Sequence, residues 1–214
     1  VYGSIVMHET LDRNLMSSIS YEEDDTGQYK SSPMISEYND VGNLMWNYQY
    51  PLKSQTFTNL YSLTSLPNGN VFSLLHTDFE NGSISISGLV LSPAGQLISE
   101  NIYYTSPKRL PLNRSLVISP TSGSPYFGFV LNISKYGHNG RLKGDLGETL
   151  YCVEPEALIF LVDFENYNVF ASDKIKDFWI DSALDTGDGI YFSGAMSDQC
   201  RFNLIMGGVP TFGF

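Results

Sequence analysis

Residues 60–75 read Leu60-Tyr61-Ser62-Leu63-Thr64-Ser65-Leu66-Pro67-Asn68-Gly69-Asn70-Val71-Phe72-Ser73-Leu74-Leu75, which is two apolar segments separated by a short polar turn. Asn68 and Gly69 accept the positive φ angles that tight turns need, and Pro67 fixes a backbone angle that a central strand rarely accepts. The flanking aliphatic and aromatic residues pack well on the pleated surface of a sheet. The segment therefore predicts a β-hairpin.

Hairpins of two kinds recur along the chain. The first kind lies at 34–46, 86–98 and 159–170; the second, which includes 60–75, lies at 116–130 and 180–192, with a weaker copy at 4–16. The last turn residues are at positions 14, 42, 69, 95, 123, 166 and 189, so successive steps are 28, 27, 26, 28, 43 and 23 residues. Because the two kinds alternate, the full period is 53 residues from position 42 to 95 and 54 residues from 69 to 123, where nothing is inserted.

A unit of about 50 residues with two hairpins contains four strands, which is the size and strand content of a β-propeller blade. The sequence therefore predicts an all-β fold of β-propeller-like, tandem four-stranded antiparallel blades. The blade-like units are 1–50, 58–104, 113–175 and 178–214, in a single domain or a propeller fragment. A β-sandwich is the alternative, because its turns recur roughly every 8 to 12 residues and imitate such a period.

Two segments carry a resemblance to a known family. They are Asn39-Asp40-Val41-Gly42-Asn43-Leu44-Met45-Trp46 and Leu184-Asp185-Thr186-Gly187-Asp188-Gly189-Ile190-Tyr191-Phe192-Ser193-Gly194. The pattern resembles the repeat of secreted bacterial β-propeller proteins and covers most of the chain in degenerate copies. The resemblance implies the fold and an extracellular or cell-surface location, and it carries over no catalytic residues.

The composition excludes several kinds of partner. The net charge is −11, with 23 acidic and 12 basic residues, so the chain repels phosphate backbones and we expect no nucleic-acid partner. The same charge disfavours anionic lipid surfaces. No apolar run approaches the roughly 20 residues of a spanning helix, so the chain is not expected to span a membrane.

The long step of 43 residues points to an insertion at about Lys135–Pro155, interpreted as a loop. Loops on a rigid β scaffold often carry recognition, and this one contains aromatic and cationic side chains. The candidate binding residues are Tyr136, His138, Arg141 and Tyr151; a merely decorative loop is the alternative. Cys152 and Cys200 could form one disulfide or remain two free thiols.

No metal site or catalytic residue is predicted. Calcium is the one cofactor that the acidic residues suggest. The acidic run 22–25 lacks EF-hand spacing, however, and is interpreted as a polar loop. Asp185 and Asp188 lie where a hairpin turn favours Asp. The three histidines, His8, His76 and His138, are isolated, and the chain has neither a nucleophile elbow nor a phosphate-binding loop.

These observations predict a non-enzymatic, secreted or cell-surface binding or scaffold module that takes a protein or glycan partner, as part of a larger surface assembly. One alternative is a propeller-type glycan-active hydrolase, which needs two positioned carboxylates. Another is a structural all-β domain of a fibre, capsid or outer-membrane assembly.

Overall fold

The computed structural model describes residues 5–10, 13–23, 27, 29–51, 56–108, 112–118, 124–143 and 149–196. Every regular element within these residues is a β-strand. No helix in this part of the chain is long and apolar enough to cross a membrane. The chain divides into two compact units, Val1–Arg109 and Leu110–Phe214.

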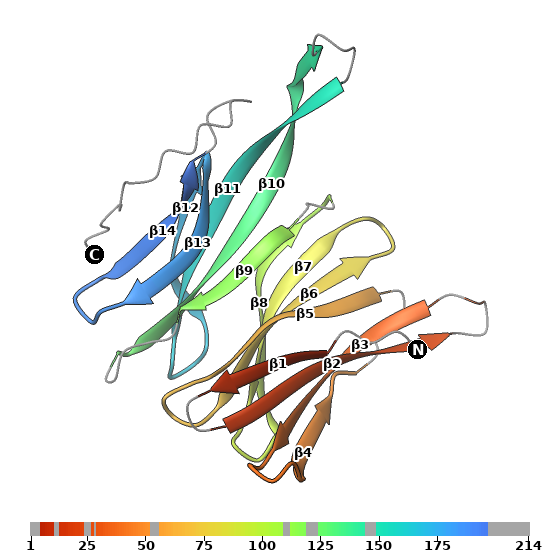
Figure 1. Cartoon of the computed structure of the whole chain (residues 1–214), viewed down its shortest axis with the longest axis vertical. Coiled ribbons are helices and arrows are strands. Elements are labelled where there is room, and N and C mark those ends of the chain that lie inside the picture. The colour runs from red at the N-terminus through yellow and green to blue at the C-terminus, as the bar shows by residue number, and fades with distance from the viewer. Residues whose placement is uncertain are drawn as a thin grey trace. The chain divides into compact units, whose positions relative to one another are not determined.

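The first unit contains two antiparallel meanders of four strands each (Figure 1). The strands of the first meander are β1 (Ile5–Thr10), β2 (Arg13–Glu23), β3 (Tyr29–Tyr38) and β4 (Leu44–Gln49). Those of the second are β5 (Thr56–Ser65), β6 (Val71–Phe79), β7 (Ile84–Leu91) and β8 (Leu97–Ser106). One parallel bridge, between Ser31 on β3 and Phe57 on β5, joins the meanders into a single sheet.

The second unit contains one four-stranded meander and one hairpin. The meander consists of β9 (Leu112–Ile118), β10 (Tyr126–Lys143), β11 (Thr149–Asp163) and β12 (Val169–Lys176). The hairpin consists of β13 (Phe178–Asp185) and β14 (Ile190–Met196). The predicted fold class is therefore confirmed: the chain is all-β, with tandem, propeller-like antiparallel units, of which three have four strands and the last is described as the hairpin β13–β14. That these units form a single domain stays a prediction.

Four hairpin turns of the first unit share one geometry. They span residues 39–43, 66–70, 79–83 and 92–96, and in each the first residue's N–H donates to the last residue's carbonyl at 2.8–3.0 Å. The fourth residue is always a glycine with φ between 76° and 82°. This is the three-residue hairpin loop that ends in a left-handed residue, so the predicted turn chemistry at Gly42, Gly69 and Gly95 is correct. The turn at 79–83 was not predicted.

The interpretation of Lys135–Pro155 as a loop is wrong for the residues that the structure describes. β10 continues to Lys143 and β11 begins at Thr149, so most of this stretch forms the end of a long hairpin. Tyr136 lies opposite Val153 and Arg141 opposite Tyr151, so five steps along β10 match two along β11. Glycine and asparagine are common both in loops and in β-bulges, and here the segment 137–140 supplies a bulge.

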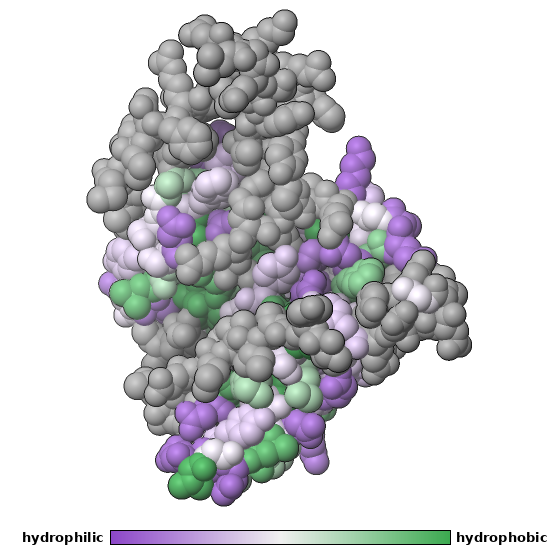
Figure 2. All heavy atoms as spheres, turned by 45° about the vertical axis from the view of Figure 1, so that its right-hand side comes forward, coloured by the Kyte–Doolittle hydropathy of each residue, from purple (hydrophilic) through white to green (hydrophobic). Residues whose placement is uncertain are grey.

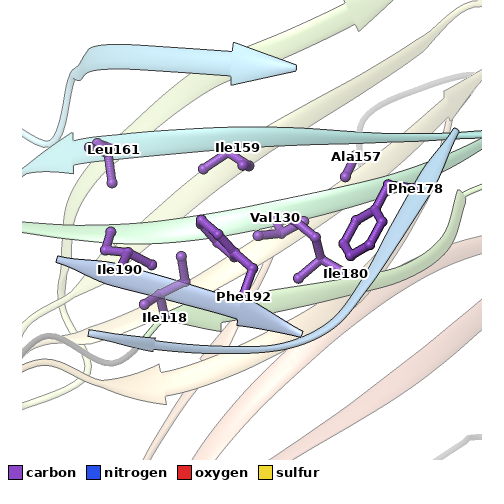
Figure 3. Packing of buried hydrophobic residues seen from close by; sticks show 9 residues of the cluster. All are labelled: Ile118, Val130, Ala157, Ile159, Leu161, Phe178, Ile180, Ile190 and Phe192. Atoms are coloured by element: carbon purple, nitrogen blue, oxygen red, sulfur yellow. The ribbon is translucent and has the colours of Figure 1, made fainter. Parts of the chain in front are cut away.

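Each unit has its own hydrophobic core. In the first unit, the core joins β2–β4 to β5–β7 through Leu15, Ile35, Tyr50, Leu63, Val71, Leu75, Leu89 and Leu91, with Trp46, Tyr48 and Leu60 packed against them. In the second unit, the hairpin β13–β14 packs on the β9–β12 sheet (Figure 3). Figure 3 shows Phe178, Ile180, Ile190 and Phe192 pointing toward Ile118, Val130, Ala157, Ile159 and Leu161.

A buried side chain ties the hairpin to the sheet in the second unit. Asn132 on β10 is 3% exposed. Its Nδ2 donates to the carbonyl of Ile180 at 2.8 Å, and its Oδ1 accepts the N–H of Ile180 at 3.0 Å. Ile180 lies at a register shift in the β13–β14 ladder. Asn132 therefore satisfies two backbone groups that would otherwise be buried without partners.

Candidate binding cleft

Cross-strand pairing brings together four residues that are far apart in the sequence. Tyr21 on β2 lies opposite Ser31 on β3, and Phe57 on β5 lies opposite Asp78 on β6. Direct partners in an antiparallel ladder project from the same face of the sheet. The Ser31–Phe57 bridge then places the two pairs next to each other.

A cleft of about 470 Å³ opens at this junction, and all of its described lining residues belong to the first unit. This volume lies in the range of small-ligand pockets, roughly 300–1,000 Å³. Its described lining combines three aromatic rings, two carboxylates and small polar groups: Tyr21, Ser31, Phe57, Asn59, Asp78, Phe79, Glu80 and Gly82.

Hydrogen bonds hold the floor of the cleft in place. The buried Ser31 Oγ donates to the carbonyl of Thr58 at 3.1 Å. The hydroxyls of Thr58 and Thr77 lie 3.2 Å apart across β5 and β6. One wall is the tight turn 79–83, where the N–H of Gly82 donates to the carbonyl of Phe79 at 2.9 Å. The lining therefore stands on paired strands and a closed turn, which favours a preformed site.

Two of the three aromatic side chains in the cleft remain accessible. Phe57 is 44% exposed and Phe79 is 38% exposed. Single exposed apolar residues are ordinary on protein surfaces. Two phenylalanines that line one concave site are instead a source of binding energy, because an occupant removes them from water.

The cleft is also acidic. Asp78 comes from the end of β6 and Glu80 from the following turn. None of the described residues that line the cleft is lysine or arginine. His76 is buried behind the cleft, with its Nε2 3.8 Å from Asp78 Oδ1 and its ring centroid 5.2 Å from that of Tyr61. The sequence analysis treats His76 as isolated, and the structure gives it two neighbours: Asp78, two positions further along β6, and Tyr61 on the adjacent strand β5.

A second feature of the same unit is an exposed apolar region at the β3–β4 turn and on β4. Val41, Leu44 and Met45 are 80%, 53% and 60% exposed. Figure 2 shows hydrophobic residues gathered at the lower end of the visible face, the end where β4 lies in Figure 1. Asp40, the charged residue of this turn, accepts a hydrogen bond from Nδ2 of Asn14 at 3.2 Å.

The binding residues predicted from the sequence lie in the second unit. Tyr136, His138 and Arg141 belong to β10 and Tyr151 belongs to β11, and Arg141 pairs directly with Tyr151. His138 lies in the irregular segment between Tyr136 and Arg141. Their side chains lie outside what the structure describes, so their role in binding stays a prediction.

The possible disulfide is untested for a similar reason. Cys152 lies on β11, but its side chain is not described, and Cys200 lies outside the described residues. The two alternatives for Cys152 and Cys200, one disulfide or two free thiols, therefore both stay open.

The two acidic segments considered in the sequence analysis, the run 22–25 and the turn that contains Asp185 and Asp188, lie in different kinds of structure. In the run 22–25, Glu22 and Glu23 form the end of β2 rather than a loop, and positions 24–25 lie outside the described residues. Asp185 Oδ1 accepts the N–H of Gly187 at 2.9 Å, and Asp188 accepts the hydroxyl of Thr186, so both carboxylates stabilise the β13–β14 turn. The described residues include no group of three or more His, Cys, Asp or Glu side chains placed to hold a metal ion.

Sequence reasoning missed the cleft. Its one local signal is Asp78-Phe79-Glu80-Asn81-Gly82, in which acidic and aromatic residues lead into an Asn-Gly turn. The contributions of Tyr21 and Ser31 depend on the bridge between β3 and β5, and no local pattern marks that bridge.

Comparisons with known proteins assign no family to the chain. No protein-family model matches it, and no curated protein does. Among solved structures, the WD40 domain of SCAP from fission yeast is 12% identical, with 89% of this chain and 61% of that chain covered and a TM-score of 0.29. A complex of the fission yeast SREBP–SCAP binding domains is also 12% identical, with 98% and 58% covered and a TM-score of 0.31. The chain thus spans about three fifths of the length of either structure.

Proposed function

We propose that this chain is a non-enzymatic binding module whose cleft in the first unit receives a segment of a partner protein. The observation that carries the proposal is the cleft itself: two accessible phenylalanines and two carboxylates on a floor of paired strands. Rigid β scaffolds that present such concave, mixed sites are suited to recognition without chemistry.

The size of the apolar contribution indicates the strength of binding. If a phenylalanine side chain offers about 200 Å², the exposed fractions of Phe57 (44%) and Phe79 (38%) together amount to about 160 Å². Burying that area is worth roughly 4 kcal/mol. Association costs about 4–15 kcal/mol in lost freedom, so the aromatic contacts alone do not sustain a complex. The polar groups of the cleft must contribute, and we expect weak, reversible binding of a peptide segment.

A displayed library of random peptides, selected on the full chain, tests this proposal. Selected peptides should lose binding to a Phe57→Ala/Phe79→Ala variant. They should keep it with a Met45→Ala/Ile102→Ala variant, which removes two exposed apolar side chains from the same unit outside the cleft. Circular dichroism should show that both variants remain folded. The proposal is wrong if no peptide is enriched over an unrelated β-protein, or if the two variants lose binding equally.

The setting of the module is a further part of the proposal. We place it outside the cell, secreted or on the cell surface and within a larger assembly, on the grounds of its acidic charge and its degenerate turn repeats. Fractionation of the native source, followed by detection of the chain, tests the location; finding it only inside the cell would exclude this setting.

The two carboxylates of the cleft favour one second candidate function, glycan hydrolysis. Hydrolysis by this route needs an acid and a second carboxylate that face each other across the substrate. Here Asp78 is half-buried, whereas Glu80 is exposed in the tight turn 79–83, and this exposed position is poorly suited to a general acid. Assays on a panel of chromogenic glycosides test this candidate function. Turnover that disappears in both the Asp78→Asn and the Glu80→Gln variant would show that the chain is a hydrolase and not a binding module.

A further inference from the structure

We infer that Asn81, in the tight turn 79–83, is an attachment site for an N-linked glycan. The inference rests on the extracellular setting proposed above, because N-linked glycans are carried by surface loops of secreted proteins. It does not depend on what occupies the cleft. It combines the acceptor motif Asn-x-Ser with the geometry of the turn that contains it.

The acceptor motif alone does not identify a site. The sequence contains it three times, at Asn81-Gly82-Ser83, Asn113-Arg114-Ser115 and Asn132-Ile133-Ser134. Asn132 is 3% exposed and its Nδ2 donates to the carbonyl of Ile180, so a bulky sugar there is incompatible with the core of the second unit. Asn113 belongs to β9, and its side chain lies outside what the structure describes. Asn81, in contrast, is exposed.

The turn orients the amide of Asn81. Its Oδ1 accepts two hydrogen bonds from Ser83, one from the backbone N–H at 2.9 Å and one from the hydroxyl at 2.6 Å. Because a backbone N–H can only donate, the atom that faces it is the oxygen, and the other arm of the amide is Nδ2. Neither bond uses Nδ2, which is the atom that takes the glycan.

The chemistry of transfer needs this nitrogen and a hydroxyl two residues further on. Nδ2 attacks the anomeric carbon of an oligosaccharide that is activated as a lipid-linked diphosphate, and a C–N bond forms. The C–O bond to the diphosphate breaks, the diphosphate leaves with the electron pair, and Nδ2 loses one proton to a base of the transferase. The secretory pathway supplies the donor and the transferase, and this chain supplies the acceptor amide and the hydroxyl of Ser83.

The surroundings of the turn have room for a sugar. A Cβ added at Gly82 would have nothing within 4 Å, and Glu80, on the other side of Asn81, is exposed. Asn81 is not among the described residues that line the cleft, whereas Phe79, Glu80 and Gly82 are. A glycan on Asn81 would therefore be attached beside the cleft and leave its lining unmodified.

The turn 66–70 is a control within the same chain. It has the same backbone geometry, and Asn68 occupies the position that Asn81 has in its own turn. Asn68 is also exposed, and its Oδ1 accepts the N–H of Asn70 at 3.1 Å. Asn70 stands where the other turn has Ser83, so the hydroxyl is missing. We therefore expect a glycan on Asn81 and none on Asn68.

Production of the full chain behind a secretory leader in cultured eukaryotic cells tests the site. Peptide N-glycosidase converts a glycosylated asparagine to aspartate, and mass spectrometry of the peptides locates the change. Digestion in heavy-oxygen water labels the aspartate that the enzyme makes and separates it from spontaneous deamidation of the Asn-Gly pair. Asn81→Gln and Ser83→Ala should each remove the glycan, whereas Ser83→Thr, which keeps the hydroxyl, should retain it.

The outcomes separate this inference from the proposals above. An unmodified Asn81 in the secreted chain, or a glycan there that persists in Ser83→Ala, would overturn the inference and leave the binding function standing. The leader supplies entry to the secretory pathway, so the same peptide analysis of the chain from its native source tests the setting. A labelled Asn81 in the native chain would support both, and a native chain found only inside the cell would exclude the setting and with it the inference.

Discussion

Replacing Gly95 by alanine should destabilise the first unit far more than the same replacement at Gly82, although the two glycines have nearly the same backbone conformation. Their φ angles are 76° and 79°, and both occupy the fourth position of the same type of turn. A Cβ at Gly82 would have nothing within 4 Å. A Cβ at Gly95 would lie 2.5 Å from Cδ2 and Cε3 of Trp46, whose indole packs against the core.

The expected magnitudes follow from two separate costs. Placing alanine in the left-handed region costs about 1–2 kcal/mol at either site, partly offset by the lower entropy of the unfolded chain. At Gly95 the indole must also move by about 1 Å to restore an ordinary contact, and overpacking of this kind costs about 1–3 kcal/mol. We therefore expect a loss of about 1 kcal/mol for Gly82→Ala and about 2–4 kcal/mol for Gly95→Ala.

Urea unfolding measures this difference. The two tryptophans lie one in each unit, so a Trp179→Phe background makes fluorescence report on the first unit alone. Gly42→Ala is a second control, because a Cβ there also has nothing within 4 Å at a φ of 82°. Equal shifts of the midpoint for all three variants would refute the reasoning. The reasoning would also be refuted if Gly95→Ala lowered the unfolding free energy by the same amount in a Trp46→Leu background, in which unfolding is followed by circular dichroism.

The remaining predictions concern the second unit. Asn132→Ala should lower the unfolding free energy by about 2–4 kcal/mol, because it leaves two buried backbone groups of Ile180 unpaired; Asn132→Asp, which keeps an acceptor but loses the donor, should not restore stability in thermal unfolding. Gly194→Ala should cost about 3 kcal/mol or more, since its Cβ would lie 1.7 Å from the carbonyl oxygen of Trp179. Gly189→Ala, whose Cβ has only one neighbour at 3.9 Å, should change the same midpoint little, and equal effects at the two glycines would contradict the close approach.

The parts of the fold that the sequence could predict are those that depend on local chemistry. Gly42, Gly69 and Gly95 mark turns because a left-handed residue closes each loop, and glycine adopts that conformation without a steric penalty. Their regular spacing then led to four-stranded units. The turn at 79–83 has the same chemistry, but it joins two strands that sequence reasoning had assigned to separate hairpins.

The extended hairpin β10–β11 shows where local chemistry is ambiguous. The segment 137–140 reads Gly-His-Asn-Gly, and these residues suit a loop and a bulge equally well. What distinguishes the two is whether the chain on both sides stays paired, and that depends on contacts between distant residues. The composition of the segment therefore could not show that the strands continue to Lys143 and from Thr149.

The chemistry of the cleft follows from a bulge that the core requires. Leu60 and Leu63 are three residues apart on β5, so regular alternation would send them to opposite faces, yet both pack against the core of the first unit. An irregularity between Leu60 and Ser62 takes up one residue and allows this.

The same irregularity decides which residue faces Phe57. Counted from the Ser65–Val71 pair, a regular ladder would place Phe57 opposite Phe79, as an ordinary apolar pair; the bulge places it opposite Asp78 instead. Burial of two leucines on one face thus sets an aromatic ring beside a carboxylate on the other. A sequence pattern that records only apolar periodicity could reveal that the two leucines are buried. It could not reveal that the aromatic ring lies beside the carboxylate.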